Sequence, residues 1–408
     1  MSESTTVGAM EVFVVLVAAA SMVAVLSRRL VVVPYSVALV LLGVVVAVLR
    51  PPVEIRIEPQ LILAVLLPAL VFEGAYRTDL RLLIPSLPAV LLLAVPGVLI
   101  TALLVGAVLS VAIGLDFRLS FLVGTMVAAT DPAAILAVMA QSGANRRLTT
   151  LVEAESLFND GTGVVIFSIA LGAVAAPIGP AGAAWQLVAA FVLSTVIGIA
   201  TGFAASLVLK GLDDHLVEVA ISLVAAYGSY LLAAQAGFSG LIATVACGLV
   251  FSGYGRRFGM SAETRQAIDI VWEFIAFLAT TLVFLLIGLA IVVSQLLAAA
   301  VASLAVLLAL LASRAVIVYG LLGASAWLLH RLGRLRTPMP RSWLHVIAWS
   351  GLRGAVSVAL ALSLPADLPQ RELLQGIVFG ATLLTLVIQG PTARPLISRL
   401  RLRGDQQA

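Results

Sequence analysis

The chain has 408 residues, of which 62% are hydrophobic and only 11% are charged, and its mean hydropathy is +1.16. Soluble domains contain roughly 25% charged residues, so this composition excludes a soluble globular protein. Apolar runs of about 20 residues recur along the chain, which is the length of a helix that crosses a bilayer. The net charge of +4 comes from residues in short loops between these runs, so it does not indicate nucleic-acid binding. We expect an all-α integral membrane protein.

Thirteen apolar segments are expected to cross the membrane. In chain order they are residues 8–27, 30–49, 59–76, 82–112, 117–141, 148–176, 183–209, 216–235, 238–253, 264–292, 295–323, 342–363 and 371–398. The first segment lacks a basic lead-in and carries Glu11, which disfavours a cleaved signal peptide. The longest hydrophilic stretch, residues 330–343, is too short for a soluble domain. Residues 1–408 are therefore interpreted as a single membrane domain.

Basic residues are concentrated in alternate loops. Eighteen lie on one side: Arg28, Arg29, Arg77, Arg81, Arg146, Arg147, Lys210, Arg256, Arg257, Arg265, Arg331, Arg334, Arg336, Arg341, Arg394, Arg399, Arg401 and Arg403. Four lie on the other: Arg50, Arg56, Arg118 and Arg371. Because short basic loops stay in the cytoplasm, this asymmetry predicts a multi-pass protein of the cell membrane with its N-terminus outside and its C-terminus in the cytoplasm.

Several ionisable side chains fall within the predicted spans. They are Glu73, Asp131, Glu155, Asp160, Arg314 and Arg353, with Glu218 and Glu273 nearer to span ends. Each costs at least roughly 2.5–3.5 kcal/mol at bilayer depth, so such residues are candidates for a functional site or for buried counter-charges. Arg314 and Arg353 are candidate counter-charges for Glu155 or Glu73, and we expect Arg353 to pair with Glu155.

Two of these carboxylates are expected to meet near the centre of the bilayer. Asp131 lies roughly 21 Å along the fifth span and Asp160 roughly 18 Å along the sixth, which runs in the opposite direction. In the sixth span, Ser156 and Asp160 share one helix face, while Glu155 and Asn159 share another. Glu153 is expected to be solvated near the cytoplasmic surface.

Two spans are expected to be interrupted. Pro132 follows Thr130 and Asp131, and proline disfavours helical geometry in the residue before it. Gly351 and Gly354 flank Arg353 in the twelfth span. A lone proline often only kinks a membrane helix, but two interruptions at corresponding positions are typical of an inverted-repeat transporter. Spans four to six would then mirror spans eleven to thirteen.

Signs of an enzyme or a metal centre are lacking in the sequence. It has neither a nucleophile elbow nor a glycine-rich phosphate loop, and His215, His330 and His345 are isolated from one another. The single Cys247 excludes an intramolecular disulfide and is interpreted as a packing residue. We therefore expect no enzymatic activity and no cofactor.

Five segments carry a family resemblance: "FEGA" (72–75), "ATDPAA" (129–134), "EAESLFNDGTGVV" (153–165), "SRAVIVY" (313–319) and "WSGLRGAVSVALAL" (349–362). They resemble the signature segments of the cation:proton antiporter superfamily, in its NhaP/NHE-like sodium/proton exchanger branch. The resemblance covers nearly the whole chain in order. It implies a fold with inverted repeats and two crossing, partly unwound helices.

The resemblance also implies roles for the polar residues. Asp160 would alternately bind H⁺ and a cation, with Asp131, Thr130 and Ser156 completing a Na⁺ site and Glu73 lining the approach. Asn159 would orient Asp160. Glu155 with Arg353, and Arg314, would stabilise the core. Spans within 82–176 and 295–398 would form a six-helix transport bundle, and those within 8–76 and 183–292 a dimerisation scaffold, giving a homodimer.

The function expected from these features is exchange of Na⁺ or Li⁺ for H⁺ by alternating access, serving pH and sodium homeostasis. Oxygen ligands suit these hard cations. Because Asn159 stands where electrogenic relatives have a second aspartate, the resemblance favours one-for-one, electroneutral exchange. The alternatives are a K⁺/H⁺ antiporter or a cation channel on the same scaffold, since selectivity between Na⁺ and K⁺ depends on fine cavity geometry.

Overall fold

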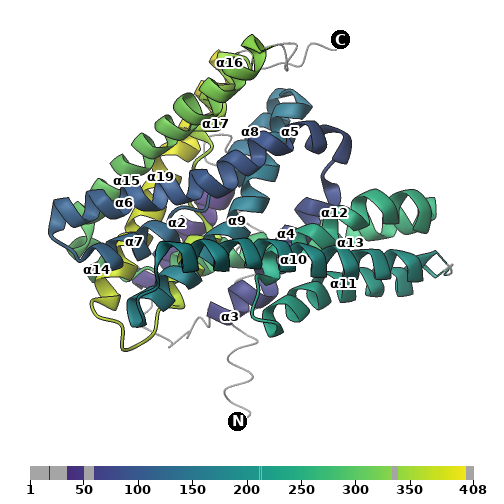
Figure 1. Ribbon diagram of the computed structural model, residues 1–408, viewed down its shortest axis with the longest axis horizontal. Helices are drawn as coiled ribbons and strands as arrows, with labels where there is room; N and C mark the ends of the chain where they lie inside the picture. Colours follow the sequence, from purple (N-terminus) through teal and green to yellow (C-terminus); the bar gives the residue numbers. More distant parts are fainter. Residues whose placement is uncertain are drawn as a thin grey trace.

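The computed structural model describes residues 18, 35–49, 59–210, 212, 214–332 and 339–400, which form helices joined by short loops (Figure 1). The elements up to the central helix are α2 (Tyr35–Leu49), α3 (Pro59–Leu61), η1 (Ile62–Leu66), α4 (Leu67–Arg77), α5 (Leu80–Leu92), η2 (Leu93–Gly97), α6 (Val98–Ile113), α7 (Phe117–Met126), α8 (Ala133–Ser142) and α9 (Arg146–Ala175). The later elements are α10 (Pro180–Leu209), α11 (His215–Gln235), α12 (Gly240–Val250), η3 (Phe251–Gly259), α13 (Ala262–Leu289), α14 (Val293–Ala298), α15 (Ala300–Ala315), η4 (Val316–Gly323), α16 (Ala324–Arg331), α17 (Arg341–Trp349), α18 (Ala355–Leu362) and α19 (Arg371–Arg399). The η elements are π-helical.

The described residues agree with the predicted spans. Eight helical segments in this part of the chain are long and apolar enough to cross a membrane, and shorter apolar helices lie in three more predicted spans. The predicted span 342–363 consists of the two short helices α17 and α18. Every predicted span from 30–49 onward has a helical counterpart whose ends differ by a few residues. The predicted first span, residues 8–27, lies outside the described residues apart from residue 18. The count of thirteen therefore stays a prediction.

Polar caps and glycines fix the helix ends. Asp79, Asp116 and Asn145 each accept a hydrogen bond from the backbone N–H two residues later, at the starts of α5, α7 and α9. Gly114 and Gly143 end α6 and α8 with φ of +67° and +64°, a conformation that side chains other than glycine disfavour. These caps satisfy backbone groups where the chain turns between spans.

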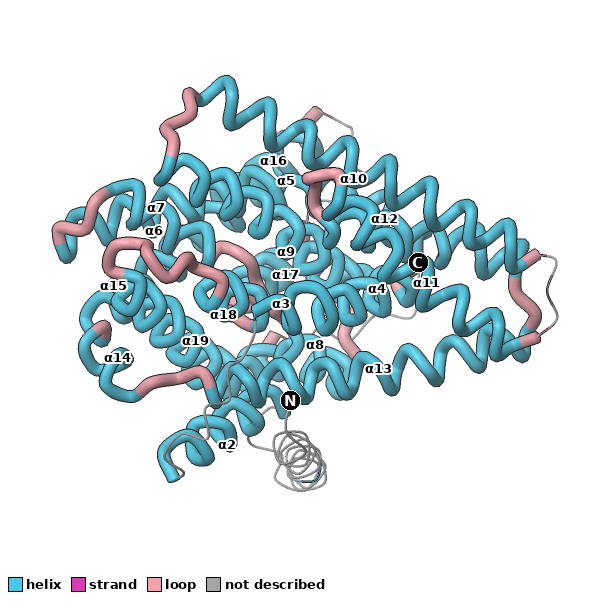
Figure 2. Tube along the Cα trace, turned by 90° about the horizontal axis from the view of Figure 1, so that it is seen from below, coloured by secondary structure: helices cyan, strands magenta, loops and turns pink. Residues whose placement is uncertain are grey.

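The helices pack in two groups with α9 between them (Figures 1 and 2). The first group consists of α2, α4 and α10 to α13. The second consists of α5 to α8 and α14 to α19. Helix α9 contacts α5 and α7 on one side and α10 and α12 on the other. The polar segment of α9 therefore lies at the junction of the two groups.

The outward face of helix α10 is apolar and exposed, as expected of a helix that contacts lipid. Only 17% of its most apolar window is buried, and Val188, Val192 and Val196 are each more than half exposed. Glycines on its other side, Gly198 and Gly202, pack so closely on α12 that an added Cβ would overlap its backbone. Small residues at such positions allow close helix approach in a membrane, where dispersion replaces the hydrophobic effect.

Both predicted interruptions are present. The α7 helix ends at Met126 and α8 starts at Ala133, so Thr130, Asp131 and Pro132 are not helical. Likewise α17 ends at Trp349 and α18 starts at Ala355. The two extended segments cross, since the Asp131 N–H donates to the Leu352 carbonyl oxygen over 2.8 Å. This hydrogen bond satisfies one backbone group in each segment, because neither group has a helical partner at the interruption.

The fourth and eleventh predicted spans also depart from regular helix. Pro96 lies in the π-helical η2, where it cannot donate a backbone hydrogen bond, and η4 is the corresponding π-helical piece between α15 and α16. The two pieces pack together: a Cβ on Gly97 would lie 3.3 Å from the Ile317 side chain. These irregularities occur in paired spans, as an inverted repeat predicts, but the repeat relation itself stays a prediction.

Candidate functional site

The Asp131 carboxylate lies where the amino ends of two half-helices converge. Its Oδ1 accepts from the Ala133 N–H at 3.1 Å, at the start of α8. The Ala355 N–H, at the start of α18, also interacts with the carboxylate, which lies against Gly354 so closely that a Cβ there would overlap it. Helix amino termini carry partial positive charge and stabilise an anion. Asp131 therefore neutralises both helix ends at the crossing.

Side chains of α9 hold the extended segment that contains Thr130. Asn159 Oδ1 accepts from the Thr130 N–H at 3.2 Å, and Asn159 Nδ2 donates to Thr130 Oγ1 at 2.6 Å. Ser156 Oγ donates to the Thr130 carbonyl oxygen at 2.9 Å. Asn159 thus bonds to both the backbone N–H and the hydroxyl of Thr130. These hydrogen bonds fix the position of the crossing relative to α9.

Asp160 opens onto a cavity of about 200 Å³ that we call the central cavity. Its polar lining consists of Glu73, Thr130, Asp131, Glu153, Ser156, Asp160, Thr280 and Ser357. Asp131 and Asp160 also interact electrostatically across it. Whereas Asp131 has backbone donors, no hydrogen bond to Asp160 is present among the described residues. Asp160 is thus the carboxylate with free oxygens for a proton or a cation.

The predicted ion-site residues lie together around one cavity, although they come from three parts of the chain. Asp160, Ser156, Asp131, Thr130 and Glu73 all line the central cavity. Asn159 is directed to Thr130, and its amide nitrogen is 3.5 Å from Glu155 Oε1, a marginal hydrogen bond. The positions of these residues agree with the predicted grouping around Asp160, and their binding roles are proposals.

The expected pairing of Glu155 with Arg353 is wrong. Arg314 Nη1 and Nη2 donate to the two Glu155 carboxylate oxygens at 2.6 and 2.7 Å, so both oxygens are used. Arg314 also donates to the Ile347 carbonyl oxygen, at 3.0 Å from Nε, and to Ser350 Oγ at 3.2 Å. The guanidinium therefore ties α9 and α15 to the end of α17. The planar fork of arginine matches a carboxylate in this bidentate arrangement.

Arg353 instead stabilises its own extended segment. Its side chain is 1% exposed and folds back so that Nη1 donates to the Gly351 carbonyl oxygen at 2.7 Å. Its backbone N–H donates to Thr385 Oγ1 of α19 at 3.1 Å. Arg353 thus satisfies backbone and side-chain groups of the unwound region, as a core-stabilising residue would, but with different partners from those expected.

The part of the central cavity lined by Glu73 and Glu153, which we call its mouth, has further charged side chains beside it. Arg77 Nε lies 2.6 Å from Glu73 Oε1, one helical turn away, and Arg77 Nη2 lies 3.1 Å from Glu273 Oε2 of α13. Glu153, expected in solvent near the surface, lines the same cavity and interacts electrostatically with Glu73. The mouth therefore presents more carboxylates than guanidinium groups, which favours entry of cations.

Sequence reasoning missed three polar residues of the cavity, Glu153, Thr280 and Ser357. Glu153 lies seven residues before Asp160, or about two helical turns, so helical periodicity alone carried a signal for the same face. Ser357 lies three residues after Gly354, in the first turn of α18. Its position could be recognised only with the crossing geometry, because nothing in the sequence aligns α18 with α9.

Glu218 is not part of this site. Its side chain is 1% exposed in α11, where Thr264 Oγ1 at the start of α13 donates a hydrogen bond to it. Trp272 of α13 donates to Ser222, one turn further along α11, at 2.9 Å. These contacts join two helices of the first group, so Glu218 has a packing role there.

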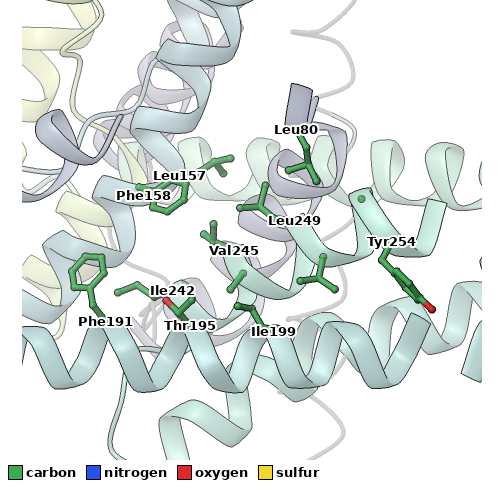
Figure 3. A pocket seen from close by; sticks show the side chains of 13 residues that line it. Leu80, Leu157, Phe158, Phe191, Thr195, Ile199, Ile242, Val245, Leu249 and Tyr254 are labelled. Atoms are coloured by element: carbon green, nitrogen blue, oxygen red, sulfur yellow. The ribbon is translucent and has the colours of Figure 1, made fainter. Parts of the chain in front are cut away.

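A second cavity, of about 330 Å³, separates α9 from α10 and α12 (Figure 3). Its lining is almost wholly apolar and includes Phe158, Phe191, Ile242 and Val245, whose side chains Figure 3 shows facing the space between the helices. Leu157 lines both this cavity and the central one. The cavity therefore lies at the boundary between the two helix groups, beside a close contact of Gly161 of α9 with Ile242 of α12.

Two interrupted helices that cross beside buried carboxylates, within a bundle of membrane-spanning helices, define a secondary ion transporter. The family description "Sodium/hydrogen exchanger, transmembrane" matches residues 14–399, and the chain belongs to this family. The family is one of transporters and not of enzymes, as predicted from the sequence.

Curated relatives of the chain are antiporters. It is 39% identical to the Na⁺/H⁺ antiporter ApNhaP of Aphanothece halophytica over 384 residues, covering 92% of this chain and 71% of that protein. It is 36% identical to the low-affinity Na⁺/H⁺ antiporter NhaS1 of Synechocystis, covering 97% and 76%. It is also 36% identical to the Na⁺/H⁺ antiporter NhaP of Pseudomonas aeruginosa, covering 82% and 80%.

The fold is that of a solved antiporter. The sodium proton antiporter MjNhaP1 of Methanocaldococcus jannaschii at pH 8 superposes with a TM-score of 0.78, covering 97% of this chain and 99% of that one at 22% identity. The predicted NhaP-like antiporter fold is thereby confirmed.

Proposed function

We propose that this protein exchanges Na⁺ for H⁺ across the cell membrane. The observation that carries the proposal is the single cavity in which Asp160, without a hydrogen-bonded partner in the described residues, faces Asp131 at the helix crossing. A charged carboxylate without a counter-ion is costly at bilayer depth, so Asp160 would hold either a proton or a cation. Competition for one carboxylate gives exchange without ATP. The names of the curated relatives support this cargo.

The residues at and around the central cavity that the sequence singled out have separate proposed roles. Asp160 exchanges the proton, and Asp131 supplies a second carboxylate held by the two helix amino ends. Ser156 and Thr130 add neutral oxygen ligands, which suit Na⁺ or Li⁺. Glu73 attracts the cation at the mouth. Asn159, Glu155, Arg314 and Arg353 hold the crossing in shape.

Alternating access would move one helix group against the other. The proposed transport bundle comprises the helices within 82–176 and 295–398, and the proposed scaffold those within 8–76 and 183–292. The apolar lining of the cavity between α9 and α10 supports this division, because apolar contacts are non-directional and leave few specific hydrogen bonds to break. We further propose that the scaffold forms a homodimer, with the N-terminus outside the cell and the C-terminus in the cytoplasm.

The proposed stoichiometry is one Na⁺ for one H⁺. Asn159 hydrogen-bonds to Thr130 and cannot titrate, which leaves Asp160 as the exchanging carboxylate. In proteoliposomes, electroneutral exchange should be independent of an imposed membrane potential. A severalfold change in Na⁺-driven proton flux on reversing the potential would contradict this stoichiometry. No observation favours the K⁺/H⁺ or channel alternatives.

The proposed function is tested by Asp160→Asn in proteoliposomes loaded with a pH-sensitive dye. Exchange should fall to the background of empty liposomes, whereas Asp367→Asn, in an exposed loop, should leave it unchanged. Adding Na⁺, Li⁺ and K⁺ separately identifies the cargo. Full activity of the Asp160 variant, or cation flux without counter-movement of protons in the unaltered protein, would contradict the proposal.

A further inference from the structure

Ser357 has a buried hydroxyl without a partner. Its side chain is 0% exposed, and Oγ has no hydrogen bond among the described residues. A buried hydroxyl without a hydrogen bond destabilises the folded protein unless a ligand satisfies it. A few other buried polar atoms lack partners, on Tyr76, Ser86, Arg353, Thr382 and Gln389, but none of these residues lines the central cavity. Ser357 does line it.

Ser357 differs from other helical serines of the described residues in lacking a backbone partner. Serines within membrane helices normally donate to a carbonyl oxygen three or four residues earlier, as Ser142, Ser168, Ser206, Ser313 and Ser363 do here. Ser357 is in the first turn of α18, and the residues three and four before it, Gly354 and Arg353, belong to the extended segment. The Gly354 carbonyl oxygen accepts a hydrogen bond from the Val358 N–H at 3.4 Å, and the Ser357 hydroxyl donates to neither of these two carbonyl groups.

The position of Ser357 completes the oxygen lining of the cavity. Ser357 lies one turn after Gly354, which touches the Asp131 carboxylate, so the hydroxyl and that carboxylate share one face of the start of α18. Ser156, Thr130 and Asp160 line the same cavity from α9 and from the other extended segment. The cavity thus has oxygen groups on the α18 side as well as on the α9 side.

We propose that Ser357 Oγ is a further ligand of the transported cation, contributed by the second interrupted helix. This inference rests on the proposed exchange at Asp160. A hydroxyl accepts a cation through its lone pairs but does not carry the exchanged proton. Ser357 therefore strengthens cation binding and leaves proton binding at Asp160 unchanged, and it couples cation occupancy to the position of α18.

The first test compares Ser357→Ala with Ser363→Ala. Ser363 ends the same helix, donates to the Leu360 carbonyl oxygen and does not line the cavity. In proteoliposomes, Ser357→Ala should raise the KM for Na⁺ about tenfold with kcat little changed, since hydrogen-bond-scale contacts to charged groups have roughly that effect. At fixed subsaturating Na⁺ the acidic limb of the activity profile should move to higher pH, because protons then compete more successfully, and the alkaline limb should stay.

Two further measurements separate the possible failures. Ser357→Thr keeps the hydroxyl and should restore most of the Na⁺ affinity, provided that its thermal unfolding matches the unaltered protein. Na⁺ should also stabilise the purified unaltered protein against thermal unfolding, because a ligand that binds only the folded state does so. Ser357→Ala should need about ten times more Na⁺ for the same stabilisation.

The inference would be overturned if Ser357→Ala had a KM for Na⁺ within twofold of that of the unaltered protein and needed a similar Na⁺ concentration for the same thermal stabilisation. That result would leave the proposed exchange at Asp160 intact. Absence of any Na⁺ stabilisation and any exchange in the unaltered protein would instead contradict the proposed function itself.

Discussion

Arg314 of α15 and Glu155 of α9 form a bidentate ion pair at 2.6 and 2.7 Å, although they are 159 residues apart in the chain. Both side chains are less than 10% exposed. The same guanidinium reaches the Ile347 carbonyl oxygen at the end of α17. One residue pair therefore connects the helix that carries Asp160 with the helix that precedes the second interruption.

Removing one member of this pair should destabilise the protein strongly. Glu155→Gln or Arg314→Gln leaves a buried charge without compensation, at a cost of about 3–5 kcal/mol. The double variant should be less destabilised than the sum of the two single variants, because no lone charge remains. Thermal unfolding of the detergent-purified variants measures this. Additive losses would show that the two charges are energetically independent.

Gly354→Ala should reduce exchange at least tenfold. An added Cβ would overlap the Asp131 carboxylate, so either the crossing or the carboxylate must shift. A shift of about 1 Å in a reacting group of an enzyme can lower the rate a hundredfold, and we expect a displaced ion-binding carboxylate to reduce transport by tenfold or more. Gly172→Ala is the matched control, since nothing lies within 4 Å of its Cβ position in α9. That control should keep full activity in the same proteoliposome assay. Equal activity of the two variants would contradict the described crossing.

Glu153→Gln should weaken Na⁺ recruitment without affecting the maximal rate. Glu153 lines the mouth of the central cavity with Glu73, and a negative lining concentrates cations locally. We expect the KM for Na⁺ to rise about threefold at low ionic strength and the effect to shrink when an inert salt is added. Glu263→Gln, on the exposed start of α13, is the control. A salt-independent loss of kcat would indicate a direct role in exchange instead.

Competition for one carboxylate predicts a bell-shaped dependence of exchange on pH. On the acidic side the KM for Na⁺ should rise about tenfold per pH unit, because protons and Na⁺ bind Asp160 exclusively of each other. On the alkaline side scarcity of protons limits the return step. Increasing Na⁺ should therefore move the acidic limb to lower pH. An acidic limb that does not respond to Na⁺ would mean that protons act at a different site.

Much of the site could be predicted from local sequence features. Apolar runs and the 1.5 Å rise per helical residue brought Asp131 and Asp160 to the same depth from antiparallel spans, and both line one cavity in the structure. Pro132 predicted the first interruption because its ring constrains the residue before it. These are properties of a few consecutive residues and of the bilayer thickness, so they need no knowledge of neighbouring helices.

The partner of Glu155 was decided only by the tertiary structure. Arg314 and Arg353 both fall at membrane depth, and chain spacing does not say which of their helices packs beside α9. In the structure Arg314 takes both carboxylate oxygens, while Arg353 turns back to the Gly351 carbonyl oxygen. Thr280 and Ser357 were missed for the same reason, since their place in the cavity depends on how α13 and α18 lie against α9. Glu153 is different, because its spacing from Asp160 already puts both on one face of α9.

The sequence by itself determined that the protein is a bundle of membrane-spanning helices, and it predicted which segments span the membrane and which carboxylates lie within them. Hydropathy and helix periodicity act along the chain and are therefore readable from it. Tertiary structure decided the ion pair, the crossing of Asp131 with Leu352 and the oxygen lining around Asp160. These features arise from contacts between side chains of distant helices, where differences of a few ångströms choose one partner over another.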